Sequence, residues 1–147
     1  MDNGSSWREQ RREAAVAHAA ALDRRKAAET AKAREYLADF VEKMKALGIE
    51  PQPLRAQVVG SGTSYRTDIT GWYLRRNRSL GVDADGNYYI LGTPASLKAR
   101  LSGVRVVPSD PPIIVGLGAR DGESLPLEQL LRHRLEEAAA GPDESRR

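Results

Sequence analysis

The sequence predicts an α+β fold, in which a long N-terminal helix and a C-terminal helix pack on a small antiparallel sheet of about four to six strands. Three observations predict it. Residues 6–47 contain neither Pro nor Gly and are rich in Ala, Arg, Glu and Lys, which favour helix. Residues 52–118 are rich in Thr, Val, Ile and Tyr, and turn signals recur along them. Residues 126–140 return to leucines at helical spacing.

The N-terminal helix has recognisable signals at both ends. Ser5 or Ser6 fits the N-cap position, and Glu9 follows Ser6 at capping-box spacing. Gly48 followed by Ile49 predicts a Schellman ending, and the next proline prevents continuation. Between these ends, the second half of the helix carries an apolar stripe consisting of Leu37, Phe40, Val41, Met44 and Leu47.

The first half of this helix carries a different surface. Between Arg8 and Thr30 the only large apolar side chains are Val16 and Leu22, and the heptad core positions are too polar for an autonomous coiled coil. A helix of about 42 residues is about 63 Å long, whereas a 100-residue domain has a radius of gyration of about 13 Å. We therefore expect a projecting, charged, Ala-rich helical arm over residues 1–30, an α+β domain over residues 31–140 and a disordered tail over residues 141–147.

The middle of the chain predicts short strands, over residues 54–59, 69–76, 79–83, 87–91, 104–107 and 113–115. Asp85-Gly86 between the third and fourth strands predicts a hairpin. In the second strand, alternation places Trp72 and Leu74 on one face and Tyr73 on the other. Pro126 suits the first turn of the last helix, and Gly141-Pro142 ends it. The expected core is Leu37, Phe40, Val41, Met44, Leu47, Trp72, Leu74, Val82, Ile90, Val106, Ile114, Leu127, Leu131 and Leu135.

The net charge of +3 is unevenly distributed. It resolves into +1 for residues 1–50, +5 for residues 51–107 and −3 for residues 108–147. A basic middle region suits a polyanion, an acidic protein surface or the chain's own acidic end. Aromatic rings interleaved with arginines on an exposed sheet face can stack bases and neutralise phosphates. The candidate residues for nucleic-acid or acidic-partner binding are Tyr73, Arg75, Arg76, Arg78 and Arg66. The alternative is that Trp72 is core and the arginines form the solvated side of an edge strand.

Several chemistries are excluded or disfavoured by the residue inventory. The chain has no Cys, which excludes disulfide scaffolds, cysteine-based zinc sites and thiol catalysis. His18 and His133 are its only histidines, and neither has a neighbouring nucleophile in the sequence. In the segment 83–87, the calcium-loop positions six and twelve would fall on Tyr88 and Pro94, so a hairpin turn is the better interpretation. No catalytic, cofactor-binding or metal-binding residue is predicted.

The segment Gly116–Gly122 is the one glycine-rich loop that precedes a helix. Its spacing, G-x-G-x-x-x-G, departs from the dinucleotide-binding fingerprint, and no parallel strand is expected after the helix. Asp121 and Glu123 would also repel a phosphate there. A structural loop is therefore favoured over a cofactor site.

These patterns favour a non-catalytic protein–protein interaction module whose projecting N-terminal helix reaches a protein partner. The alternative is RNA or single-stranded DNA binding on the basic, aromatic outer face of the sheet. A second alternative is a small enzyme or nucleotide-binding protein that uses Gly116–Gly122. No segment approaches the roughly 20 apolar residues of a membrane span, and no apolar signal segment is evident, so we expect a cytoplasmic protein with no membrane partner. The 18 Arg against 5 Lys, with 20 Ala, are typical of a GC-rich bacterial genome.

Overall fold

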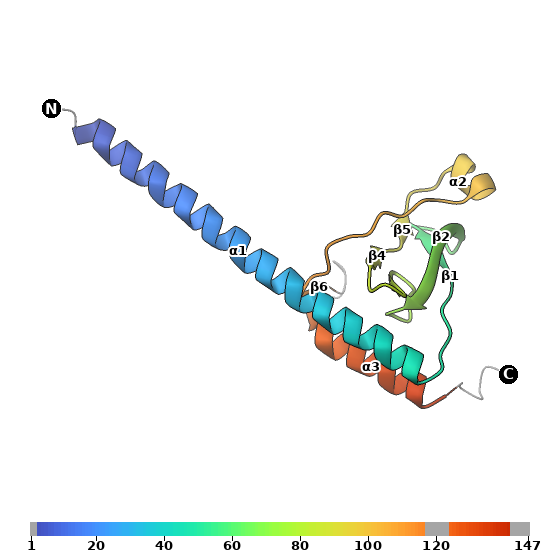
Figure 1. Ribbon diagram of the computed structural model, residues 1–147. Helices are drawn as coiled ribbons and strands as arrows, with labels where there is room; N and C mark the ends of the chain where they lie inside the picture. Colours follow the sequence, from blue (N-terminus) through green and yellow to red (C-terminus); the bar gives the residue numbers. More distant parts are fainter. Residues whose placement is uncertain (1–2, 117–123, 142–147) are drawn as a thin grey trace.

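The computed structural model describes residues 3–116 and 124–141 and confirms the α+β class (Figure 1). Its helices are α1 (Asn3–Ala46), α2 (Leu97–Ser102) and α3 (Leu127–Ala139). The described strands form a five-stranded sheet and a separate two-stranded sheet. In Figure 1, α1 and α3 lie side by side and run in the same direction, and the five-stranded sheet lies against this pair.

Helix α1 begins earlier than the capping signals predict. It starts at Asn3, so Ser5 and Ser6 lie inside the helix, and the predicted N-cap is wrong. Serine is only a moderately poor helix former, so two serines do not stop a helix that an Ala-rich segment continues. The other end is confirmed: Gly48 has a φ of 74°, and the N–H of Ile49 donates to the Met44 carbonyl at 3.1 Å, as in a Schellman motif.

The larger sheet has the order β4-β3-β2-β1-β5. Its strands are β1 (Gln52–Val58), β2 (Ser64–Tyr73), β3 (Leu80–Asp83), β4 (Tyr88–Ile90) and β5 (Gly92–Thr93). The predicted hairpin between β3 and β4 is present, with Gly86 at a φ of 85°. The sheet is mixed rather than purely antiparallel, because β1 and β5 pair in parallel. A two-residue parallel pair leaves no periodic pattern that a sequence could reveal.

Leu91 closes this sheet on itself. It is the only residue between β4 and β5, which occupy opposite ends of the strand order. The Leu91 N–H donates to the Ser79 carbonyl at 2.9 Å, next to β3, and the Leu91 carbonyl accepts the Gln57 N–H of β1 at 2.6 Å. One extended segment therefore bonds to β3 through its first half and to β1 through its second, and the sheet curls around its own interior.

The curled sheet has apolar clusters on both of its faces. The outer cluster joins the sheet to α1 and α3 and includes Leu37, Phe40, Trp72, Val82 and Leu127. The inner cluster consists of Leu54, Ile69, Tyr73, Tyr89 and Leu91, with Val106 packed against it. The predicted alternation along β2 is therefore correct, but the face expected to be open to solvent is a second core.

Most of the predicted core is buried, and the exceptions have local causes. Leu47, Ile90 and Ile114 are each about half exposed, so their assignment to the core is wrong. Leu47 lies beyond the last residue of α1. Ile90 and Ile114 precede the buried Leu91 and Val115, and neighbouring strand residues point to opposite faces. Two others are half-buried, and nine are buried: Leu37, Phe40, Val41, Met44, Trp72, Leu74, Val82, Leu127 and Leu131.

The remaining elements depart from the predicted strands in part. Residues 104–107 form no strand, although Val104 makes an isolated bridge to Thr67. Strand β6 (Ile114–Gly116) corresponds to the strand predicted over residues 113–115. It pairs with β7 (Ser124–Pro126), a strand that the sequence did not indicate. Helix α2 was missed because six residues are too few to show a helical period. The predicted disordered tail lies outside the described residues except for Gly141.

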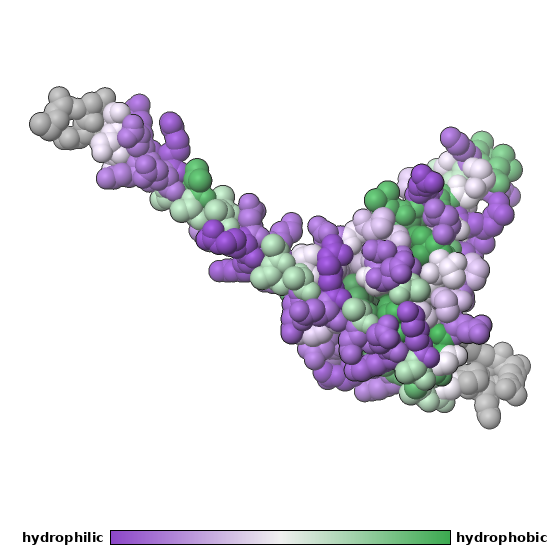
Figure 2. Space-filling view, viewed as in Figure 1, coloured by the Kyte–Doolittle hydropathy of each residue, from purple (hydrophilic) through white to green (hydrophobic). Residues whose placement is uncertain are grey.

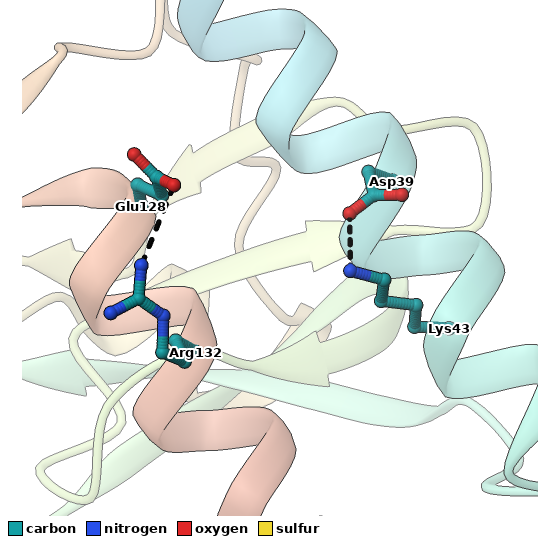
Figure 3. Close-up of polar contacts among 4 residues, drawn as sticks. All are labelled: Asp39, Lys43, Glu128 and Arg132. Carbon is teal, nitrogen blue, oxygen red and sulfur yellow. Dashed lines mark hydrogen bonds and ion pairs between the residues drawn. The ribbon is translucent and has the colours of Figure 1, made fainter.

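In the part of the chain that the structure describes, no hydrogen bond or ion pair joins α1 to α3, although each helix has ion pairs within itself. Lys43 Nζ lies 2.8 Å from Asp39 Oδ2, and Arg132 Nη2 lies 3.5 Å from Glu128 Oε1. Figure 3 shows the two pairs, each of which joins residues four apart in one helix. Exposed pairs of this type contribute about 0.3–0.5 kcal/mol each. The contact between the two helices therefore depends on their apolar faces.

Candidate functional sites: the α1 arm and the arginine groove

The first of two candidate surfaces is the N-terminal part of α1. Its side chains over residues 4–32 are exposed, apart from the half-buried Ala20 and Thr30, and packing against the domain begins at the fully buried Ala33. We call residues 4–32 the α1 arm. At 1.5 Å per residue the α1 arm is about 45 Å long, and Figure 1 shows it leaving the domain as a straight extension of the packed part of α1. Arg34 pairs with Asp110 at 2.7 Å where the arm meets the domain.

The surface of the α1 arm is basic, with small apolar patches. It has seven Arg or Lys and four Asp or Glu, a net charge of +3. Figure 2 shows its strongly hydrophilic side chains interrupted by paler, more hydrophobic stretches. Trp7, Val16 and Leu22 are exposed, and the guanidinium of Arg11 lies 4.5 Å from the centroid of the Trp7 ring. A partner could therefore meet both positive charge and apolar side chains on one helix.

Tyr73, the aromatic residue of the predicted nucleic-acid site, is not available to a base. It is buried in the inner cluster, and its Oη accepts the backbone N–H of Arg55 at 2.8 Å. The guanidinium of Arg78 lies 5.5 Å from its ring centroid. The expectation that Tyr73 lies on an open outer face is corrected because the sheet curls and encloses that face.

Of the other predicted residues of that site, three lie in the connection between β2 and β3, and Arg66 lies apart from them. Arg76 is paired with Glu137 of α3 at 3.3 Å, Arg75 is half-buried, and Arg78 adopts a left-handed φ of 60°. Arg66 lies seven residues before Tyr73 on β2, about 23 Å away along an extended strand. The structure therefore does not bring the five predicted residues together.

Arg66 instead joins two arginines that the sequence analysis did not single out. It lies directly opposite Arg55 in the β1–β2 pairing, and Arg100 approaches from α2. A recess of about 440 Å³ lies between them, and we call it the arginine groove. Its lining residues are Arg55, Thr63, Ser64, Tyr65, Arg66 and Arg100. The turn at Gly60-Ser61-Gly62 was a usable signal, because pairing the chain outward from it sets Arg55 against Arg66.

Hydrogen bonds hold the arginine groove in shape. The Arg55 side chain donates from Nε to Ser64 Oγ at 2.8 Å and from Nη2 to the Ser64 carbonyl at 2.9 Å. At the start of α2, the Ser96 N–H donates to Tyr65 Oη at 2.9 Å. At its end, Arg66 Nη2 donates to the Leu101 carbonyl at 3.2 Å. Both ends of α2 are therefore attached to β2, and this attachment positions Arg100.

The arginine groove has an unbalanced positive charge. Within the described ranges 3–116 and 124–141, no carboxylate forms an ion pair with Arg55, Arg66 or Arg100. Asp68 follows two residues after Arg66 on β2, but its carboxylate is paired with a different arginine: Asp68 Oδ2 lies 3.9 Å from Arg105 Nε. Like charges directly opposite on neighbouring strands are destabilising. An anion bound in the groove would relieve this repulsion.

The acidic turn between β3 and β4 has a structural role. Asp83 Oδ1 accepts the backbone N–H groups of Asp85 and Asn87, and its Oδ2 accepts from Asn87 Nδ2 and from Tyr89 Oη at 2.8 Å. Burial raises the pKa of Asp83, but these hydrogen bonds outweigh burial and hold the pKa below its usual value. Burial, together with the bond to Asp83, raises the pKa of Tyr89 to about 12. Among the residues described, no three metal-ligating side chains gather here or elsewhere.

Asp83→Asn is expected to lower the free energy of unfolding at neutral pH by about 1 kcal/mol, because it weakens several hydrogen bonds to a carboxylate. The Asp83 pKa is lower in the folded state, so its stabilisation is present above the unfolded-state pKa of about 3.9 and is lost as pH falls through the folded value. The raised pKa of Tyr89 stabilises the fold below about pH 10, and this contribution is lost as pH rises to about 12.

Urea denaturation at pH 7 and at about pH 3, with an ultraviolet titration of tyrosine ionisation, checks both effects. The variant should show a smaller loss of stability in acid than the parent chain and a lower pKa for Tyr89. Asp85→Asn in the same turn is the matched control, and it should leave stability unchanged within about 0.5 kcal/mol. Equal effects of the two substitutions would show that the carboxylate of Asp83 has no special role.

Other sequence expectations have separate outcomes. His18 and His133 are both exposed. Of the Gly116–Gly122 segment only Gly116, at the end of β6, is described, so that proposed loop lies outside the described residues. None of the described helices combines the length and apolar character needed to cross a membrane.

Comparison of the whole chain with known proteins returns no relatives. No protein-family model matches it, and no significant match is found among curated proteins or solved structures. The α1 arm and the arginine groove are therefore the features that support a function.

Proposed function

We propose that the chain is a non-catalytic protein-interaction module whose α1 arm docks on a partner protein. The observation that carries this proposal is the continuity of α1, whose C-terminal turns are buried in the domain while residues 4–32 are exposed. Helical stability in proteins comes mostly from packing of one face. Within residues 4–31 there is also no ion pair to stabilise the helix by itself. A docked partner would supply the missing packing.

The composition of the α1 arm supports a partner with an acidic docking face. The arm carries a net charge of +3, so a second copy of the same segment would be repelled. Six alanines lie between residues 14 and 21, and side chains this small allow a partner helix to approach closely. Exposed Val16 lies within this stretch, and exposed Leu22 follows it directly. The favoured partner is therefore a different protein that offers acidic side chains beside an apolar seam.

Site-specific cross-linking tests the docking of the α1 arm. With a photoreactive amino acid at Leu22, the chain is expected to cross-link in its native cells to an acidic protein. The same probe at Leu97, an exposed leucine on the domain, should not give that product. The partner is then purified, and its affinity is measured for the full chain and for a chain without residues 1–30. We expect deletion to weaken binding at least a hundredfold.

Two outcomes would contradict the proposal. Equal affinity of the purified partner for the full chain and the deleted chain would show that the α1 arm is not the docking element. Cross-links from Leu22 only to a second copy of this chain, with a dimer in analytical ultracentrifugation, would show self-association instead.

Deleting residues 1–30 is expected to leave the rest of the chain folded. Residues 4–30 bury little surface against the domain, so the free energy of unfolding should change by less than about 1 kcal/mol. Urea denaturation followed by tryptophan fluorescence reports the domain directly, because Trp72 remains in the outer cluster. Loss of the cooperative transition would show that the arm belongs to the folding unit.

A cytoplasmic location and a bacterial source stay predictions from the sequence. The protein partner also stays a prediction until the cross-linking experiment identifies it.

A further inference from the structure

We propose that the arginine groove binds the sugar-phosphate backbone of a single-stranded nucleic acid. This site is separate from the α1 arm and does not depend on the proposed protein partner. It also differs from the surface that the sequence predicted, since it shares only Arg66 with that set. Three features support it: the chemistry of the lining, the placement of α2 and the extension of the groove beyond one phosphate.

The lining of the arginine groove consists almost entirely of hydrogen-bond donors. Three guanidiniums are accompanied by the hydroxyl-bearing Thr63, Ser64 and Tyr65. Among the residues that the structure describes, no carboxylate and no aliphatic side chain lines the groove. Guanidinium groups match phosphate oxygens in charge and in geometry, because their N–H donors can bind two oxygens at once. An apolar ligand or a cation would find no complementary group here, whereas a phosphate would.

The orientation of α2 separates the arginine groove from a nearby apolar surface. Ala99 is buried against the sheet, whereas Leu97 and Leu101 are about 80% exposed. At 100° per residue, both leucines point away from the side that carries Ala99, and Arg100 lies on one flank of the helix. Lys98 lies on the other flank and does not line the groove. Arg100 therefore lines a recess, while the two leucines project from the side of α2 that faces away from Ala99.

A second recess lies next to the arginine groove. It has a volume of about 420 Å³, begins at Arg66 and extends along Thr67 and Asp68 to the segment 102–105. Arg105 lies at its far side, beside Asp68. Arg66 lines both recesses, so they adjoin at this residue. Two adjoining recesses, both lined by Arg66, suit a chain of phosphates better than a single phosphate ion.

The test measures binding of the full chain to a fluorescein-labelled, single-stranded oligonucleotide of about 12 nucleotides by anisotropy. The informative pair of variants is Arg100→Ala and Lys98→Ala, which each remove one positive charge from the same exposed helix. We expect Arg100→Ala to weaken binding about tenfold, the value of one charge-assisted hydrogen bond to phosphate. Lys98→Ala should change affinity less than twofold. The charges of the α1 arm are present in both variants, so they do not affect the comparison.

Salt dependence provides a second readout. The logarithm of the binding constant should fall linearly with the logarithm of salt concentration, and Arg100→Ala should reduce the slope by about 0.7, as expected for one lost phosphate contact with a single strand. The double variant Arg55→Ala with Arg100→Ala should bind about a hundredfold more weakly than the parent chain. Unchanged urea denaturation curves of the Arg100 and Lys98 variants show that both remain folded.

Four outcomes would overturn the proposal. One is the absence of binding at low salt, and another is an equal effect of Arg100→Ala and Lys98→Ala. A third is that inorganic phosphate displaces the oligonucleotide and binds the chain with an affinity equal to that of the oligonucleotide. That result would assign the groove to a single phosphate. The fourth is a combination of two results. The chain binds vesicles of anionic lipid in a way that depends on Leu97 and Leu101, and the oligonucleotide binds the parent chain no better than it binds the Arg100→Ala variant. That result would assign the α2 surface to a membrane.

Discussion

Replacing Leu91 with alanine is expected to lower the free energy of unfolding by about 3 kcal/mol, within the 2–5 kcal/mol range of large-to-small core substitutions. Leu91 is fully buried in the inner cluster, so the lost methyl groups leave a cavity inside the curled sheet. The surrounding structure cannot collapse into it easily, because the backbone of Leu91 is bonded to Ser79 beside β3 and to Gln57 of β1. Urea denaturation monitored by circular dichroism measures the change.

Ile90→Ala is the matched control for this substitution. Ile90 is the preceding residue in the chain and has a similar size, but it is about half exposed. Its truncation should change the free energy of unfolding by less than about 1 kcal/mol, because little of the side chain is packed. If both variants lost the same stability, the interior of the curled sheet would not be a close-packed core.

Gly71→Ala is expected to cost about 3 kcal/mol or more, which can prevent a small domain from folding. A Cβ atom at Gly71 would collide with the Val82 carbonyl oxygen and lie 2.8 Å from the Asp83 Cα. Both obstacles are backbone atoms of β3, the strand that pairs with β2 at this point. Neither can move aside as a flexible side chain would, so the two strands must separate.

Gly92→Ala provides the comparison for a glycine in the same sheet. Apart from Gly92 and its two chain neighbours, no described residue comes within 4 Å of the position that a Cβ would take there, and the φ of Gly92 is not in the left-handed region. Alanine there should leave stability unchanged or raise it by about 0.4–1 kcal/mol, since it restricts the unfolded chain. Thermal denaturation of the two variants measures the difference. A Gly71→Ala protein as stable as Gly92→Ala would show that β2 and β3 are not so closely paired.

Local signals predicted the features that neighbouring residues determine. Gly48 and Ile49 end α1 because a left-handed glycine and the bond that follows it involve only adjacent turns. Asp85 and Gly86 predict the β3–β4 hairpin for the same reason. The length of α1 also followed from composition, since no helix-breaking residue interrupts it between residues 6 and 47.

The misplaced features depend on contacts between distant residues. Tyr73 alternates with Trp72 as predicted, but its face is enclosed because Leu91 bonds to both β1 and β3. No pattern within β2 indicates that closure. The arginine groove likewise requires Arg55, Arg66 and Arg100 to converge from three elements. The sequence around the Gly60–Gly62 turn can indicate the pairing of Arg55 with Arg66, but it does not indicate the approach of Arg100.

The unbroken course of α1 has a consequence for how two bound molecules would be spaced. A flexible linker of about 30 residues has an average end-to-end distance of about 30 Å and points in every direction. A helix of the same length that enters the folded core without interruption holds its tip about 45 Å away along one line. The α1 arm therefore fixes both the distance and the direction between its tip and the domain. A partner protein bound at Trp7 would lie at a fixed distance and in a fixed direction from a nucleic-acid strand bound at Arg66. Each residue removed from the helix would rotate the bound partner by 100° about the helix axis.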